Sequence, residues 1–93
     1  MRLTEHERHT LISTIRAADP DATLWLFGSR VDDHALGGDI DVLVMSQRMR
    51  LSEKLDVLAR LHTLLGEQKI DLTIARDDSR PFIRLAKAGG IQL

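Results

Sequence analysis

The fold is decided by residues 23–45, which read TLWLFGSRVDDHALGGDIDVLVM. Residues 23–27 and 39–45 are rich in aromatic, aliphatic and β-branched side chains, a composition typical of strands. Residues 28–38 between them are polar and contain three glycines, so we expect a loop or a single helical turn there. The stretch therefore predicts two strands joined by one short polar connection.

Helices are predicted on both sides of this stretch. Thr4 and Glu7 form a capping-box signature, and the apolar residues that follow recur at helical spacing over residues 5–18. Ser52 is expected to cap a second long helix, and Gly66 is expected to end it. Five leucines of this second helix form one stripe, which we expect to lie in the core: Leu51, Leu55, Leu58, Leu61 and Leu65.

A third strand and a last helix complete the predicted fold. Residues 69–75 alternate in polarity, with Asp71 on the face opposite the apolar side chains. Pro81 suits the first turn of a helix that ends near Gly89. The order of elements predicts an α/β (α+β) fold, with a small mixed β-sheet of three or more strands and helices on one face, in a single domain over residues 1–93. The other face of the sheet is expected to remain open.

The composition excludes several classes of protein. Thirteen Lys and Arg residues and fourteen Asp and Glu residues give a net charge of −1, which argues against direct binding of nucleic acid. The absence of cysteine excludes disulfides and thiolate zinc sites. No apolar run is long enough to span a bilayer, and the first residues lack the apolar segment of a signal peptide. We therefore expect a cytoplasmic protein that does not bind membranes.

Asp39, Asp41 and Asp71 are unusual because aspartate is depleted in strands. Asp39 and Asp41 are two residues apart and therefore project from the same face, about 7 Å apart along the strand. Two close carboxylates repel each other unless a cation lies between them, and their oxygens are ligands that suit Mg²⁺. If the two strands are adjacent, the three carboxylates form the kind of patch that two-metal phosphoryl transfer requires. The alternative is that they are turn residues on a solvated face.

Gly28, Ser29 and Arg30 directly follow the first strand and offer groups that bind phosphate. Glycine lets the backbone approach a ligand, and the N–H groups of a tight turn can surround phosphate oxygens. Ser29 adds a hydroxyl and Arg30 adds a positive charge, although Gly-Ser alone is more often an ordinary turn. Gly37 and Gly38 either let the chain return into the second strand or keep side chains away from a triphosphate.

Other residues of chemical interest are expected to serve the structure. The four histidines have no spacing that would bring them together with a carboxylate pair. Trp25 is part of the alternating pattern of the first strand and is expected to lie in the core, although it could border an adenine pocket.

Residues 26–30, LFGSR, followed by residues 37–44, GGDIDVLV, resemble the nucleotidyltransferase fold shared by DNA polymerase beta and kanamycin nucleotidyltransferase. The family pattern is Gly-Ser, a short gap, and Asp-x-Asp on the next strand, and nine residues separate Ser29 from Asp39 here. A third family aspartate lies on a later strand and corresponds to Asp71. The resemblance extends over essentially the whole chain and implies the palm-like fold of polymerase beta.

By this resemblance, the loop would bind a nucleoside triphosphate and the aspartates would bind metal. Gly28 and Ser29 would hold the β- and γ-phosphates of ATP, and Arg30 would neutralise phosphate charge. Asp71 would also help to activate the acceptor hydroxyl, with pyrophosphate as the leaving group. The cofactor would be Mg²⁺, or Mn²⁺ in its place. The nucleotide-binding residues would be Gly28, Ser29, Arg30 and Gly38, and the catalytic metal ligands would be Asp39, Asp41 and Asp71.

Within this family, the chain resembles the minimal nucleotidyltransferases, which are often encoded beside a small helical HEPN protein as a toxin–antitoxin pair. That resemblance implies a protein adenylyltransferase that transfers AMP from ATP to a tyrosine hydroxyl of a HEPN toxin and so acts as an antitoxin. Two alternatives stay open: an antitoxin that only binds its toxin, and a small-molecule nucleotidyltransferase of the aminoglycoside type. The larger relatives carry acceptor-binding domains, so we expect the acceptor here to come from another protein. A homo-oligomer is also compatible with the sequence.

Overall fold

The computed structural model describes residues 1–34 and 38–93 of the chain. The elements are α1 (Glu5–Ala18), β1 (Thr23–Phe27), the 3₁₀ turn η1 (Gly28–Val31), β2 (Ile40–Met45), α2 (Leu51–Leu65), β3 (Ile70–Ala75), α3 (Pro81–Gly89) and β4 (Ile91–Gln92). The predicted α+β class with a mixed sheet is confirmed, as are the three predicted helices. No helix in the described ranges has the length and apolar composition to cross a bilayer.

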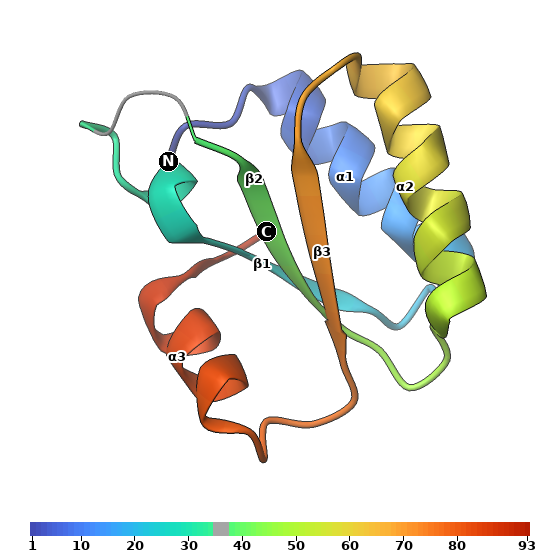
Figure 1. The fold of residues 1–93 in the computed structure, drawn as a ribbon, viewed down its shortest axis with the longest axis vertical. Coiled ribbons are helices and arrows are strands. Elements are labelled where there is room, and N and C mark those ends of the chain that lie inside the picture. The colour runs from blue at the N-terminus through green and yellow to red at the C-terminus, as the bar shows by residue number, and fades with distance from the viewer. Residues whose placement is uncertain (35–37) are drawn as a thin grey trace.

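The strands form one sheet in the order β3-β2-β1-β4 (Figure 1). β1 pairs antiparallel with both β2 and β4, whereas β2 pairs parallel with β3. A parallel pair needs a long crossover connection, which α2 supplies. The sequence did not predict β4, because a strand of two residues is too short to show an alternating pattern. In the structure, β4 pairs with β1, with Ile91 opposite Leu26.

α1 and α2 lie side by side on one face of the sheet and cover the main core (Figure 1). The capping box of α1 is confirmed: the Glu7 N–H donates to the Thr4 hydroxyl at 3.0 Å, and the Thr4 N–H donates to the Glu7 carboxylate at 2.8 Å. The strands contribute alternate residues to this core, such as the fully buried Leu24, Leu26 and Val42. The intervening residues, including the aspartates of β2 and β3, therefore face the opposite side of the sheet.

α3 packs on this opposite face, where the sequence predicted no helix. Ile83 and Ala86 are buried against Leu43 and Ala75 in a second, smaller apolar cluster. Leu43, Met45 and Ala75 are apolar outward positions of β2 and β3 beyond the aspartates, so a helix there removes apolar surface from water. The prediction that the helices share one face is correct for α1 and α2 and wrong for α3. Trp25, which was expected in the core, is partly buried at the edge of this second cluster.

The start of α2 differs from its prediction. The helix begins at Leu51, and Arg50 is its N-cap residue. The Arg50 N–H donates to the Glu53 carboxylate at 2.9 Å, which satisfies a backbone donor at the helix start. Ser52 lies inside the helix and does not cap it. The side chain of Glu53, the next residue, accepts the hydrogen bond at the helix start instead. The predicted end of the helix at Gly66 is confirmed.

The buried face of α2 is centred on Val57 and Leu61 rather than on the whole leucine stripe. With about 100° per residue, Leu55 lies about 200° around the helix from Val57. Leu55 is accordingly 55% exposed and Leu51 is 67% exposed, so the prediction that they are core residues is wrong. The leucines of the stripe that are fully or partly buried are Leu58, Leu61 and Leu65.

We expect Leu61→Ala to lower the free energy of unfolding by about 2–5 kcal/mol, because a fully buried side chain leaves a cavity when it is truncated. Leu55→Ala is the matched control on the exposed side of the same helix, and it should change the free energy of unfolding by less than about 0.5 kcal/mol. Urea denaturation of the two variants measures both values. Equal losses would contradict the buried face described here.

Candidate functional site

Three neighbouring strands bring Phe27, Asp41 and Asp71 into one row across the sheet. Phe27 pairs with Asp41 in the antiparallel β1–β2 register, and Asp41 pairs with Asp71 in the parallel β2–β3 register. Paired strands are about 4.8 Å apart, and directly paired residues project from the same face. This is the face on which α3 packs, but the aspartates lie outside the apolar cluster that α3 covers. The structure thus brings Asp41 and Asp71 together, as adjacent strands were expected to do.

The Asp41 carboxyl has a raised pKa. Burial is the largest cause, because a partly buried charge loses hydration, and the negative charges of Asp71 and Asp39 raise the pKa further. A hydrogen bond with Asp71 acts in the same direction, whereas the positive charge of Lys69 acts against it. The fold therefore places the Asp41 carboxyl beside two other carboxylates, whose negative charges repel its ionised form. A bound cation would relieve that repulsion.

Asp39 stands apart from this pair. It immediately precedes β2, and its carboxylate lies 3.4 Å from the Nζ atom of Lys69. The Ile40 N–H donates to the Lys69 carbonyl at 3.0 Å, which holds the starts of β2 and β3 together. Sequence reasoning did not single out Lys69, because a lysine at the start of a strand is ordinary. Lys69 precedes Asp71 by two residues, and this spacing places both side chains on the same face of the sheet, at the start of β3.

The carboxylates fit a divalent cation as a pair rather than as a preassembled set of three. Among the described residues, no group of three or more His, Cys, Asp or Glu side chains could hold a metal ion. Mg²⁺ commonly binds through one or two protein carboxylates and completes its shell with water and substrate phosphates. Asp41 and Asp71 meet that requirement. The Asp39 carboxylate is paired with Lys69 instead.

Gly28 and Gly38 leave space that any other residue would fill. Gly28 has a φ of +75° and lies against Asp41, so a β-carbon at Gly28 would overlap the Asp41 carboxylate. Gly38 has a φ of +93° and lies against the Ser29 hydroxyl in the same way. Glycine adopts these left-handed conformations readily, and its missing side chain lets the loop approach the carboxylates. Gly37 lies outside the described residues.

Arg30 is engaged by groups from three other segments of the chain. Its guanidinium donates to the carbonyl oxygens of Gly38 at 3.3 Å and Arg2 at 2.8 Å, and to Gln68 Oε1 at 3.4 Å. Gln68 Nε2 in turn donates to the Glu7 carboxylate at 2.7 Å. Arg30 therefore ties the loop after β1 to the start of α1 and to the segment before β3. This network gives Arg30 a positioning role, and its contact with phosphate stays a prediction.

We expect Gly28→Ala to lower the free energy of unfolding more than Gly66→Ala does. Both glycines have a positive φ, +75° and +81°, so both alanine variants carry backbone strain of about 1–3 kcal/mol. The two variants differ in what the new β-carbon meets. At Gly28 it would overlap the Asp41 carboxylate, whereas at Gly66 no atom lies within 4 Å of its position. Thermal melts measure the difference. The extra loss at Gly28 should disappear in an Asp41→Ala background, and an extra loss that persists there would contradict the contact.

We expect Asp41→Asn to raise the free energy of unfolding of the metal-free protein at neutral pH. The pKa of Asp41 lies above its ordinary value of 3.8 in the folded state, so ionisation of this carboxyl costs stability once the pH exceeds the raised value. Well below pH 3.8 the carboxyl is protonated in both states, and the advantage of the variant should vanish. Urea denaturation in chelator at both pH values checks this. A variant that is less stable than the parent at neutral pH would identify Asp41 as a structural residue.

Comparison with known proteins adds to this geometry. The family model described as "Polymerase beta, Nucleotidyltransferase" matches residues 9–93. That range contains η1, both strands that carry the aspartates, and α3. No curated protein matches the chain.

Two solved structures share the fold. One is a crystal structure of a tyrosine-to-alanine mutant of the toxin–antitoxin MntA-HpeT. Its TM-score is 0.72 at 23% sequence identity, and the match covers 92% of this chain and 69% of that chain. The other is a mutant of the same toxin–antitoxin in which two aspartates are replaced by glutamate; its TM-score is 0.72 at 22% identity, with 92% and 70% covered. At these identities the likeness concerns the fold alone.

Proposed function

This chain belongs to the polymerase beta nucleotidyltransferase family, and from that premise we propose that it transfers a nucleotidyl group from ATP to a hydroxyl group of a partner protein. The proposal is carried by the contact between Gly28 and Asp41, with Asp71 paired beside them. A turn that suits phosphate thus adjoins two carboxylates that suit a divalent cation. Nucleotidyl transfer needs both, because a polyphosphate must be held in line with an acceptor while its charge is neutralised.

In the proposed reaction, the acceptor oxygen bonds to the α-phosphorus of ATP, and the bond from that phosphorus to the oxygen bridging to the β-phosphate breaks. Pyrophosphate leaves, and the proton of the acceptor hydroxyl passes to a carboxylate. Asp71 is proposed to take this proton, because it is exposed whereas Asp41 is partly buried. Gly28 and Ser29 would hold the β- and γ-phosphates through backbone N–H groups and the Ser29 hydroxyl.

Mg²⁺ or Mn²⁺, when bound, would neutralise the charge that develops on the phosphates. Asp41 and Asp71 are proposed to hold the ion through their oxygens, with Asp39 joining them once it separates from Lys69. The Lys69 ammonium would then be available to the phosphates at the same end of the sheet. Arg30 would keep the loop in place through the hydrogen bonds described above.

The proposed partner is a toxin, which would make this chain an antitoxin. The likeness to the MntA-HpeT toxin–antitoxin structures supports this assignment. We propose more specifically that the partner is a HEPN-domain protein and that AMP is transferred to one of its tyrosines. A catalytically silent antitoxin is the second candidate. It is favoured by the pairing of Asp39 with Lys69 and by the lack, among the described residues, of a preassembled group of three metal ligands.

Incubation of the chain with ATP, Mg²⁺ and the proposed HEPN-domain partner should add AMP to that partner and abolish its toxin activity. Intact-mass spectrometry of the toxin reads the modification directly. Asp39→Asn/Asp41→Asn should abolish the mass change, because the variant loses two of the three carboxylates that attract the cation.

Leu64→Ala serves as the matched control for this transfer, because Leu64 is 52% exposed and lies on α2, away from the row of carboxylates. It should modify the toxin as the parent does. A toxin whose mass stays unchanged, but which is blocked at an equimolar ratio, would contradict the transfer and support the silent antitoxin.

A further inference from the structure

A shallow apolar pocket adjoins the row of carboxylates on the side of Gly28. Its volume is about 270 Å³, and it lies between the end of β1, the start of η1 and α3. None of its lining residues has a polar side chain. The lining residues are Phe27, Gly28, Phe82, Leu85, Ala86 and Gly89.

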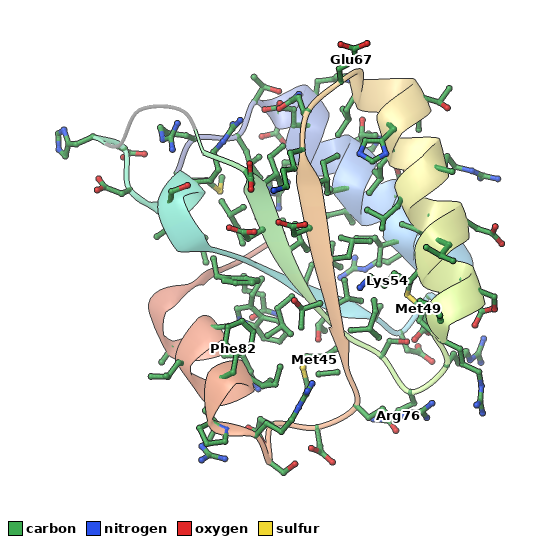
Figure 2. The ribbon with its side chains drawn as sticks, viewed as in Figure 1. Met45, Met49, Lys54, Glu67, Arg76 and Phe82 are labelled. Atoms are coloured by element: carbon green, nitrogen blue, oxygen red, sulfur yellow. The ribbon has the colours of Figure 1, made fainter. Side chains whose placement is uncertain are left out.

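Two large apolar side chains of this pocket are exposed to solvent. Phe82 is 54% exposed and Leu85 is 72% exposed. Phe82 projects from α3 toward the sheet (Figure 2), where its ring meets that of Phe27 edge to face, with centroids 5.8 Å apart and planes at 83°. Edge-to-face is one of the two arrangements that aromatic pairs prefer. Exposed apolar side chains grouped around a hollow beside charged residues indicate a binding surface.

We infer that this pocket holds the base of the nucleoside triphosphate through apolar contact and ring stacking, an inference that rests on the proposed function. Gly28 connects the two sites, because it lines the pocket and also lies against Asp41. The pocket at about 270 Å³ is smaller than the 300–1,000 Å³ typical of sites that enclose a whole ligand. It therefore suits a single ring system, with the ribose and phosphates lying outside it.

The proposed position of the phosphates favours the base over the ring of an acceptor tyrosine. In an in-line displacement, the acceptor oxygen and the leaving pyrophosphate lie on opposite sides of the α-phosphorus. The β- and γ-phosphates are assigned to Gly28 and Ser29, so the pyrophosphate leaves on the side that the pocket borders. The acceptor must then approach from the other side, and the base is the remaining ring of the reacting molecules.

The chemistry of the pocket also determines how the base is selected. No side chain in its lining can hydrogen-bond a base edge. Stacking on an aromatic ring tolerates every base, because every base has a π-face. Purines offer two fused rings and pyrimidines one. ATP and GTP should therefore bind with similar affinity, and both should bind more tightly than UTP.

Calorimetric titration with Mg·ATP and with Mg·tripolyphosphate, which has no base, tests this inference. Phe82→Ala should weaken Mg·ATP binding by roughly fivefold to a hundredfold, the effect of removing one stacked aromatic side chain, and should leave Mg·tripolyphosphate binding unchanged. Leu85→Ala is a second variant of the pocket and should act in the same direction. Leu64→Ala, at a similarly exposed position of α2, should change neither affinity. Thermal melts establish that each variant is folded.

The outcomes separate this inference from the proposed function. If the parent binds Mg·tripolyphosphate as tightly as Mg·ATP, or if Phe82→Ala weakens both ligands alike or neither, the base does not occupy the pocket and the inference is overturned while the proposed function stands. If Phe82→Ala weakens only the binding of the toxin, the pocket is a protein-docking surface, which also overturns the inference. If the parent binds neither ligand, the proposed function fails and the inference fails with it.

Discussion

The candidate site depends on the parallel pairing of Asp41 with Asp71, which places two negative charges side by side on neighbouring strands. Like charges directly opposite each other destabilise a sheet. The strands cannot escape the repulsion by sliding, because a shift of one residue would turn their apolar side chains out of the core. Val42 is fully buried and Leu72 is 3% exposed beneath α1 and α2, so the packing on one face enforces the charge arrangement on the other.

Local signals in the sequence predicted most of the fold. The first helix and the first strand have the predicted bounds, because a capping box and an uninterrupted run of β-forming residues are both local patterns. The errors concern features that depend on tertiary contacts. The face that α3 covers is determined by apolar positions spread over separate strands. The exposure of Leu55 is determined by how α2 packs on the sheet.

The pairing of two site residues could be predicted. Asp41 and Asp71 were predicted to lie together because side chains alternate with a period of two residues, so paired residues of adjacent strands share a face. The sequence did not mark Lys69 or Phe82 as residues of a site. A lysine at the start of a strand and a phenylalanine in a helix are both ordinary.

The loop after β1 is held by groups that also define the first helix. Glu7 completes the capping box and accepts a hydrogen bond from Gln68, which in turn accepts one from Arg30. Burial acts to raise the pKa of Glu7, but the hydrogen bonds from Thr4 and Gln68, with the charge of Arg30, lower it overall. The carboxylate is therefore kept ionised where the network needs an acceptor. The start of α1 thus belongs to the support of the candidate site, although it lies outside the motif that first attracts notice.

The parallel register also has a consequence for the order in which the chain folds. Asp41 and Asp71 are separated by thirty positions in the sequence and meet only after α2 has crossed over the sheet, whereas β1 and β2 are joined by a shorter connection. Long-range pairings form after local ones because the closure of a longer loop costs more entropy. We expect the repelling pair to assemble late, after the transition state for folding has passed. Its strain would then accelerate unfolding while leaving the folding rate nearly unchanged.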